Sequence, residues 1–250
     1  MPLGRTAWLG ALIGLLTACH SPRPAVSPSA STSPMRLLFV GNSLTYYNGG
    51  LENHVRLLAA SATPARLVEA DRATQGGATL RTLHGLPRVH ERIRTGRYNR
   101  VILQDDIPEF PEHRIDPFDE FVRLFDSEIR ATGARTVLFM AWPYERLGWI
   151  SLESIAEAHH RIGAELGLPV APVGLAFRRS LEARPGLPML GPDGEHESLH
   201  GTYLAACVIY STVFEANPVG LPYHPEGVSA EEATFLQTIA WQSRPKRPRP

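Results

Sequence analysis

The sequence predicts an α/β domain in which helices cover both faces of a five-stranded parallel sheet. Short apolar runs rich in β-branched residues alternate with longer segments of helical period, which is the pattern of this fold class. The chain has 250 residues, of which 43% are hydrophobic, so it can bury one substantial core without a second domain. We therefore expect a three-layer α/β/α sandwich.

Five apolar runs are expected to form the strands of this sheet. They are residues 35–41, 65–70, 100–104, 135–142 and 169–174. Between the third and fourth runs, Asp116 is expected to cap a helix with Pro117 in its first turn. The apolar face of that helix would carry Phe118, Phe121, Phe125 and Ile129. Ser229 and Glu232 form a capping-box pattern, which predicts a last helix that runs to about Gln242.

The N-terminus has the pattern of an export signal. An apolar run over 7–16 follows one basic residue and is too short to span a bilayer. It ends in Leu16-Thr17-Ala18-Cys19, which resembles the lipobox of bacterial lipoproteins. The pattern predicts a signal peptide over 1–18 and lipidation of Cys19. A buried N-terminal helix with a chance cysteine is the alternative, and the Pro/Ser-rich sequence that follows disfavours it.

The remaining segments define one domain between two polar ends. Residues 19–34 are expected to be a solvated tether, 35–242 the folded domain and 243–250 a disordered basic tail. A membrane partner is expected through the lipid anchor. If the host is Gram-negative, resemblance to the sorting rule of its lipoproteins implies the outer membrane, because His20 rather than Asp follows the cysteine. The balanced charge predicts no nucleic-acid partner. Cys207 lies in an apolar helical stretch and is expected in the core.

The candidate nucleophile is Ser43, which follows the first predicted strand in Gly41-Asn42-Ser43. In an open parallel sheet the loops at the carboxyl ends of the strands converge on one crevice, and this serine would lie there. The preceding glycine permits a sharp turn. The alternative is that Ser43 simply caps the helix that follows.

The candidate base is His196, three residues after Asp193 in a turn-forming segment about 150 residues further on. Asp193 could hold the Nδ1–H of the imidazole and leave Nε2 free to take the Ser43 proton. This is the division of roles in a serine–histidine–acid triad. Without Ser43, a loop histidine with ordinary hydrogen bonds would be the better interpretation.

The Gly-Asn-Ser block and the Asp-x-x-His block, in this order near the two ends of such a domain, resemble the SGNH (GDSL-like) hydrolase superfamily over 35–242. That resemblance implies a flavodoxin-like fold and an oxyanion hole made by the N–H of Ser43, the N–H of a glycine after the second strand and an amide side chain after the third. The glycine would be Gly77, with Gly76 as plausible, and the amide would be Gln104. The family pattern at this point is Gly-x-Asn-Asp, whereas this chain has Leu103-Gln104-Asp105-Asp106. Both aspartates are expected to point outward.

Two other functions fit parts of the sequence. His196-Glu197-Ser198-Leu199-His200 satisfies the zinc-protease pattern, but Pro192 and Gly194 lie immediately before it, where a helix would be needed. A binding lipoprotein that retains the hydrolase fold without turnover is the third possibility, although it needs neither Ser43 nor the Asp193/His196 pair. We therefore expect a serine esterase without metal or cofactor.

The expected substrate is a small-molecule or carbohydrate ester, with acetylated sugars favoured by resemblance and lipid or aryl esters equally compatible with the catalytic residues. The pocket would be formed by the loops at 46–47, 109–117 and 142–149. Trp142, Tyr144 and Trp149 could stack on a sugar there or pack beneath the loop.

Overall fold

The computed structural model describes residues 33–244 of the chain. The predicted signal peptide, Cys19, nearly all of the tether and most of the basic tail lie outside these residues. Within 33–244, no helix is both long and apolar enough to cross a bilayer.

The centre of the domain is a five-stranded parallel sheet with the strand order β2-β1-β3-β4-β5. The strands are β1 (Met35–Gly41), β2 (Val68–Thr74), β3 (Arg100–Gln104), β4 (Arg135–Phe139) and β5 (Val170–Ala171). The order reverses at β1, which lies between β2 and β3, and ligands of such sheets bind beyond the carboxyl ends of the strands at this point.

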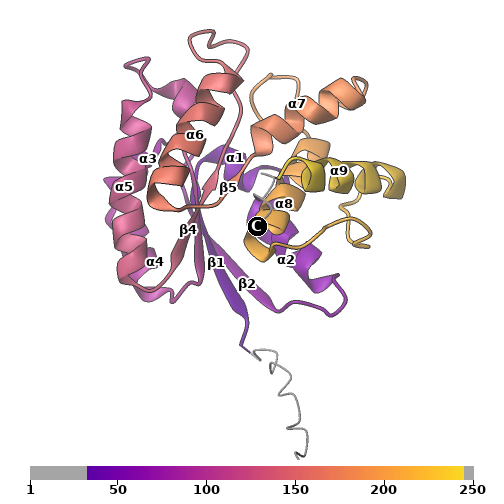
Figure 1. Ribbon diagram of the computed structural model, residues 1–250, viewed down its shortest axis with the longest axis horizontal. Coiled ribbons are helices and arrows are strands. Elements are labelled where there is room, and N and C mark those ends of the chain that lie inside the picture. The colour runs from indigo at the N-terminus through magenta and orange to yellow at the C-terminus, as the bar shows by residue number, and fades with distance from the viewer. Residues whose placement is uncertain (1–32, 245–250) are drawn as a thin grey trace, which may run out of the picture. The chain divides into compact units, whose positions relative to one another are not determined.

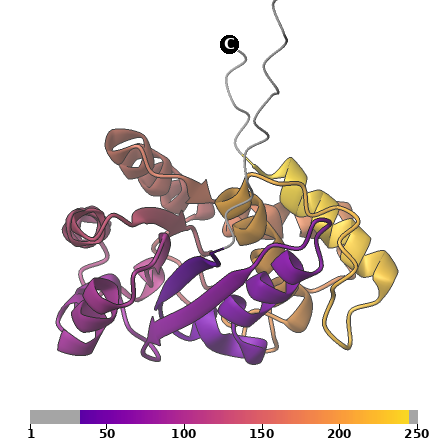
Figure 2. The same ribbon diagram turned by 90° about the horizontal axis from the view of Figure 1, so that it is seen from below.

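Helices cover both faces of the sheet, so the predicted three-layer sandwich is confirmed (Figures 1 and 2). One layer consists of α3 (Leu80–His84), α4 (Pro87–Thr95), α5 (Asp116–Ala131) and α6 (Leu152–Leu166). The other consists of α1 (Ser43–Tyr46), α2 (Leu51–Ala60), α7 (Val173–Ala183), α8 (Leu199–Phe214) and α9 (Ala230–Gln242). Two short 3-10 turns, η1 (Tyr47–Gly49) and η2 (Ile107–Glu109), follow α1 and β3.

Helix α8 forms the centre of the second layer. It packs against α2, α7 and α9, and nearly all of its residues are buried. A helix that is apolar on all sides is stable in water only when it is surrounded in this way. Cys207, in the middle of α8, is fully buried, which confirms that it is a core residue.

Three strand boundaries differ from those expected. The second strand lies at Val68–Thr74 rather than 65–70, and as an edge strand bonded to β1 it tolerates polar residues that hydrophobic patterning overlooks. The fifth strand has two residues because Pro172, which has no N–H, caps α7 directly after it. The fourth ends at Phe139 instead of 142, close to the point where its neighbour β5 ends.

Helix starts were predicted with mixed success. The capping box of Ser229 and Glu232 is present, and α9 ends at Gln242 as expected. Asp116, however, is the first residue of α5 and Ile115 is its cap. The Asp116 carboxylate accepts a hydrogen bond from Arg114 Nε instead of capping the helix.

Candidate active site

Ser43 begins α1, directly after the turn that ends β1. Asn42 is the cap of this helix, with its Oδ1 accepting the Leu44 N–H at 3.0 Å, so Ser43 is not needed for capping. The turn requires a glycine at position 41, because a Cβ there would lie 2.4 Å from Thr45 Oγ1 and 2.5 Å from Gln104 Oε1. Ser43 is only partly buried and lies at the carboxyl edge of the sheet.

The structure brings Ser43, His196 and Asp193 together in one chain of hydrogen bonds. His196 Nε2 lies 2.9 Å from Ser43 Oγ, and His196 Nδ1 lies 2.8 Å from Asp193 Oδ2. With the proton on Nδ1, the imidazole donates to the carboxylate and accepts from the serine hydroxyl. This geometry can remove a proton from Ser43 as its oxygen attacks an electrophile.

Backbone hydrogen bonds fix the segment that carries the acid and the base. Asp193 Oδ1 accepts the N–H groups of Glu195 and His196 at 3.1 and 3.0 Å, while its other oxygen faces the imidazole. The hydrogen bond from His196, followed by that from Glu195 N–H, lowers the pKa of Asp193. Asp193 is therefore a carboxylate under all conditions in which His196 can act as a base.

Side chains from two other segments hold the imidazole and its turn. The ring of Tyr47 stacks on His196, with 4.7 Å between centroids and 27° between planes. Trp142 Nε1 donates to the Glu195 carbonyl at 2.9 Å, and Arg146 binds the Glu195 carboxylate at 2.8 Å as well as Glu109. The sequence predicted that these loops form the pocket, but it gave Tyr47 and Arg146 no individual role, and it did not predict the hydrogen bond of Trp142 to the Glu195 carbonyl.

The aromatic side chains of the 142–149 loop pack against other side chains and are not exposed on the surface. Trp142 is buried and stacks on Phe177 with 4.4 Å between centroids, and Tyr144 is buried as well. Trp149 is partly buried, stacks on His113 and donates to the Pro108 carbonyl. Trp142 and Tyr144 are therefore not free to stack on a sugar.

Gln104 lies behind the serine turn, and its amide is already engaged. Its Oε1 accepts the Asn42 N–H at 2.8 Å and the Thr45 hydroxyl at 3.2 Å, and its Nε2 donates to the Asp105 carbonyl. The side chain is fully buried. The amide that the resemblance assigned to the oxyanion hole thus presents its oxygen to the serine turn and serves to hold that turn.

Asp105 and Asp106, which were expected to point outward, are both turned inward and are each 3% exposed. Asp105 Oδ1 accepts the N–H groups of Leu80 and Asp106 at 2.8 Å. Asp106 accepts from Asn42 Nδ2 at 2.5 Å and from the Tyr144 hydroxyl at 2.8 Å. The outward expectation was wrong because these donors replace water at Asp105 Oδ1 and at both oxygens of Asp106. Burial raises the pKa of both groups to about 7.

The glycine turn after β2 lies beside the end of β1. Gln75 N–H donates to the Gly41 carbonyl at 3.2 Å, and Ala78 N–H closes the turn onto Gln75. Gly77 has φ +63°, which favours glycine, and a Cβ there would meet open space. A Cβ on Gly76 would lie 2.9 Å from the Tyr46 hydroxyl, three residues after Ser43.

The zinc-protease pattern does not have the helical geometry that it requires. Helix α8 begins at Leu199 with Ser198 as its cap, so His196 lies before the helix and only His200 lies within it. His196 faces Ser43, whereas His200 Nε2 lies 3.5 Å from Glu232 of α9. Two histidines that bind one metal in this pattern must share a helix face.

Several solved structures have a fold similar to that of this chain. The alignment with a DUF4886 family protein from Bacteroides uniformis covers 84% of this chain and 95% of that protein, with a TM-score of 0.70 and 17% sequence identity. A lipase/acylhydrolase from Enterococcus faecalis (72% and 95% covered, TM-score 0.59, 17% identity) is also similar. So is an acetyl-xylooligosaccharide esterase from Geobacillus (77% and 96% covered, TM-score 0.57, 16% identity).

The chain has the SGNH hydrolase fold. At these identities the likeness lies in the arrangement of helices and strands and shows the fold alone. No protein-family model and no curated protein matches the sequence. In this fold Ser43 and His196 lie 2.9 Å apart although 153 positions separate them in the sequence.

Proposed function

We propose that this chain is a serine esterase that hydrolyses carboxylic esters through an acyl-enzyme on Ser43. The observation that carries the proposal is the continuous hydrogen-bond chain from Asp193 through His196 to Ser43, with links of 2.8 and 2.9 Å. The neighbouring structures that are named as acylhydrolases and esterases support the same reaction class.

The reaction divides into two displacements. Ser43 Oγ attacks the ester carbonyl carbon while its proton passes to His196 Nε2, and the imidazolium then gives that proton to the departing alcohol oxygen. A water molecule next attacks the acyl carbonyl, with His196 taking its proton. Collapse of the second tetrahedral intermediate releases the acid, and the proton returns to Ser43 Oγ. Asp193 orients the ring and stabilises its positive charge throughout.

The oxyanion would be held by backbone donors. Ser43 is the first residue of α1, where an N–H has no partner within the helix. The second donor would be the N–H of Gly77 or Gly76, in the turn whose Gln75 N–H is bonded to the Gly41 carbonyl. Such donors, fixed before charge develops, each contribute a few kcal/mol to catalysis. We assign no donor role to Gln104, because its amide holds the turn.

We propose an acetylated carbohydrate as the substrate. The support is that two of the similar structures are named acetyl xylan esterase and acetyl-xylooligosaccharide esterase. A panel of acetyl, butyryl and octanoyl esters that includes acetylated xylan tests this choice directly. Preference for octanoyl esters over acetyl esters would contradict it without affecting the assignment of the reaction.

The mechanism is tested with a fluorophosphonate probe on residues 33–244. We expect the probe to label Ser43, and Ser43→Ala to lose both labelling and esterase activity. His200→Ala is the matched control, since His200 faces α9, and it should remain active and labelled. A Ser43→Ala variant that retains activity would refute the proposal, and a wild type without turnover on any ester would indicate a binding protein.

A further inference from the structure

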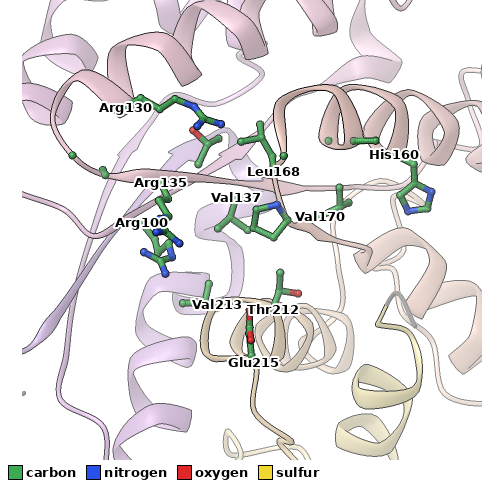
Figure 3. Close-up of a pocket in the computed structure, with 17 residues that line it drawn as sticks. Arg100, Arg130, Arg135, Val137, His160, Leu168, Val170, Thr212, Val213 and Glu215 are labelled. Atoms are coloured by element: carbon green, nitrogen blue, oxygen red, sulfur yellow. The ribbon is translucent and has the colours of Figure 1, made fainter. Parts of the chain in front are cut away.

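A groove lies at the opposite edge of the sheet from Ser43. It has a volume of about 890 Å³ and is lined by the first residues of β3 and β4, the ends of α5 and α6, and the last turn of α8 (Figure 3). Because all five strands are parallel, this amino-terminal edge is separated from the serine turn by the length of the strands. The esterase mechanism uses none of the residues that line this groove.

Two arginines stand side by side on one wall. Arg100 opens β3 and Arg135 opens β4, and the two are direct partners in the register of the parallel pair. Figure 3 shows their guanidinium groups close together over the groove. Burial, together with the charge of Arg135, lowers the pKa of Arg100, so the pair is under mutual repulsion. An anion placed between the guanidinium groups would relieve this repulsion.

The other charged side chains in and beside the groove are one more arginine and two carboxylates. Arg130, a third arginine, is held by Asp126 at 2.6 Å and by the Leu166 carbonyl. Glu215, at the end of α8, lines the groove and attracts Arg100. Three arginines thus face two carboxylates in and beside the groove.

Apolar side chains form the rest of the lining. Val137 and Val170 come from the sheet, Leu168 from the loop before β5, and Val213 from α8. All four are largely buried and belong to the cores of the two helical layers. A groove with a cationic wall and an apolar wall matches a ligand that has an anionic head and an aliphatic body.

We propose that this groove binds an anionic amphiphile, with a phosphate or carboxylate head between Arg100 and Arg135 and an aliphatic chain along Val170 and Val213. The planar fork of each guanidinium can bind such a head through two hydrogen bonds. The ligand is either a soluble amphiphile or the head-group region of a lipid, since both present the same chemistry.

The test is calorimetric titration of residues 33–244 with octyl phosphate, with inorganic phosphate and octanol as the separate halves of the ligand. We expect octyl phosphate to bind at least about tenfold more tightly than either half, and binding to weaken as salt rises. Arg100→Gln and Arg135→Gln should each weaken it about tenfold or more. Arg179→Gln, the same charge change on an exposed face of α7, should leave it within twofold.

Two further arms complete the experiment. Arg135 is exposed, so its Gln variant should fold, and unchanged esterase activity would show that the other edge of the sheet is intact. Cosedimentation with vesicles with and without phosphatidic acid identifies the source: arginine-dependent binding to the acidic vesicles indicates a lipid head group, and binding of octyl phosphate alone indicates a soluble ligand. Absence of octyl phosphate binding, or equal binding by wild type and both arginine variants, would overturn the proposal.

Discussion

The ring of Tyr47 lies over the imidazole of His196, 4.7 Å between centroids, and covers one face of the proposed base. Tyr47 is itself 41% exposed, so its ring is positioned against His196 without being part of the core. Removal of the ring should allow the imidazole to leave its alignment with Ser43. We expect Tyr47→Ala to lower kcat about tenfold, a cost near 1.4 kcal/mol. Tyr47→Phe retains the ring and should be close to wild type in steady-state kinetics; equal losses in the two variants would assign the effect to the hydroxyl.

Loss of the orienting carboxylate should be more severe. In Asp193→Asn an uncharged amide replaces the carboxylate that accepts the Nδ1–H of His196. The imidazole is then no longer held in the tautomer with the proton on Nδ1, and the imidazolium is no longer stabilised by a negative charge. We expect kcat to fall by roughly 10²- to 10⁴-fold with little change in thermal stability, because the Asp193 side chain is about half exposed and an ion pair in contact with water contributes little to folding. A calorimetric melt together with ester kinetics measures both quantities. Near-normal turnover would remove Asp193 from the mechanism.

The buried carboxylate of Asp106 is expected to position the serine turn. It accepts from Asn42 Nδ2, and Asn42 in turn caps α1 directly before Ser43. Asp106→Ala leaves two buried donors without a partner and should lower kcat by about 10- to 100-fold while KM changes little. Tyr144→Phe removes only the other hydrogen bond to the same carboxylate and is the matched control. If the two variants lost activity equally, the Asn42 link would not be the cause.

Glu197 predicts a pH dependence of stability. It is 1% exposed, and burial raises its pKa to about 8 from an ordinary value of 4.5. The folded state therefore keeps this proton when the unfolded chain has lost it. Stability is complete below about pH 4.5 and is lost as the pH rises through 8. Glu197→Gln should remove this loss and increase the free energy of unfolding at pH 9 by on the order of 4 kcal/mol, with no gain at pH 4.

Chemical unfolding of both proteins between pH 4 and 9 measures the effect. Glu157→Gln, at an exposed position of α6, provides the control and should differ from wild type by a constant amount. A difference between wild type and Glu197→Gln that does not vary with pH would show that the carboxyl group titrates normally.

We propose that Cys19 carries a lipid anchor after export. The support is the lipobox-like segment that ends at this cysteine. When the full chain is expressed in a bacterial host, it should become labelled with palmitate and be recovered in the membrane fraction. The Cys19→Ala variant should carry no label. Cys207→Ala is the control, because that thiol is buried in α8 and cannot be acylated in the folded protein. Label retained by Cys19→Ala would exclude the anchor.

Most of the fold could be predicted because the buried strands have a strong apolar signal. The runs at 35–41 and 100–104 coincide with β1 and β3, which lie inside the sheet with neighbours on both sides. Both edge strands were displaced. Val68–Thr74 carries alternating polar residues, and Val170–Ala171 is ended by a proline, so their limits depend on pairing with β1 and β4 and not on local hydrophobicity.

The site was predictable where spacing within the chain sets the geometry, and unpredictable where distant groups do. Asp193 and His196 are three residues apart in one turn, so their contact follows from local structure. The inward turn of Asp106 depends on Asn42 and Tyr144, which are 64 and 38 residues away. Gln104 has the same difficulty, because its amide oxygen is taken by the serine turn.

The two ends of strand β1 lie at opposite edges of the sheet. The chain enters the sheet at Met35, and the proposed nucleophile Ser43 follows shortly after Gly41. At roughly 3.3 Å per residue the two ends of this strand are about 20 Å apart, on opposite edges of the sheet. A domain held by its N-terminal side, whether on a bilayer or on a chromatography bead, would therefore expose the Ser43 crevice to the surrounding liquid. Immobilisation ahead of residue 33 should leave even long polysaccharide chains free to reach the serine, whereas attachment through the glycine turn at 75–78 should obstruct them.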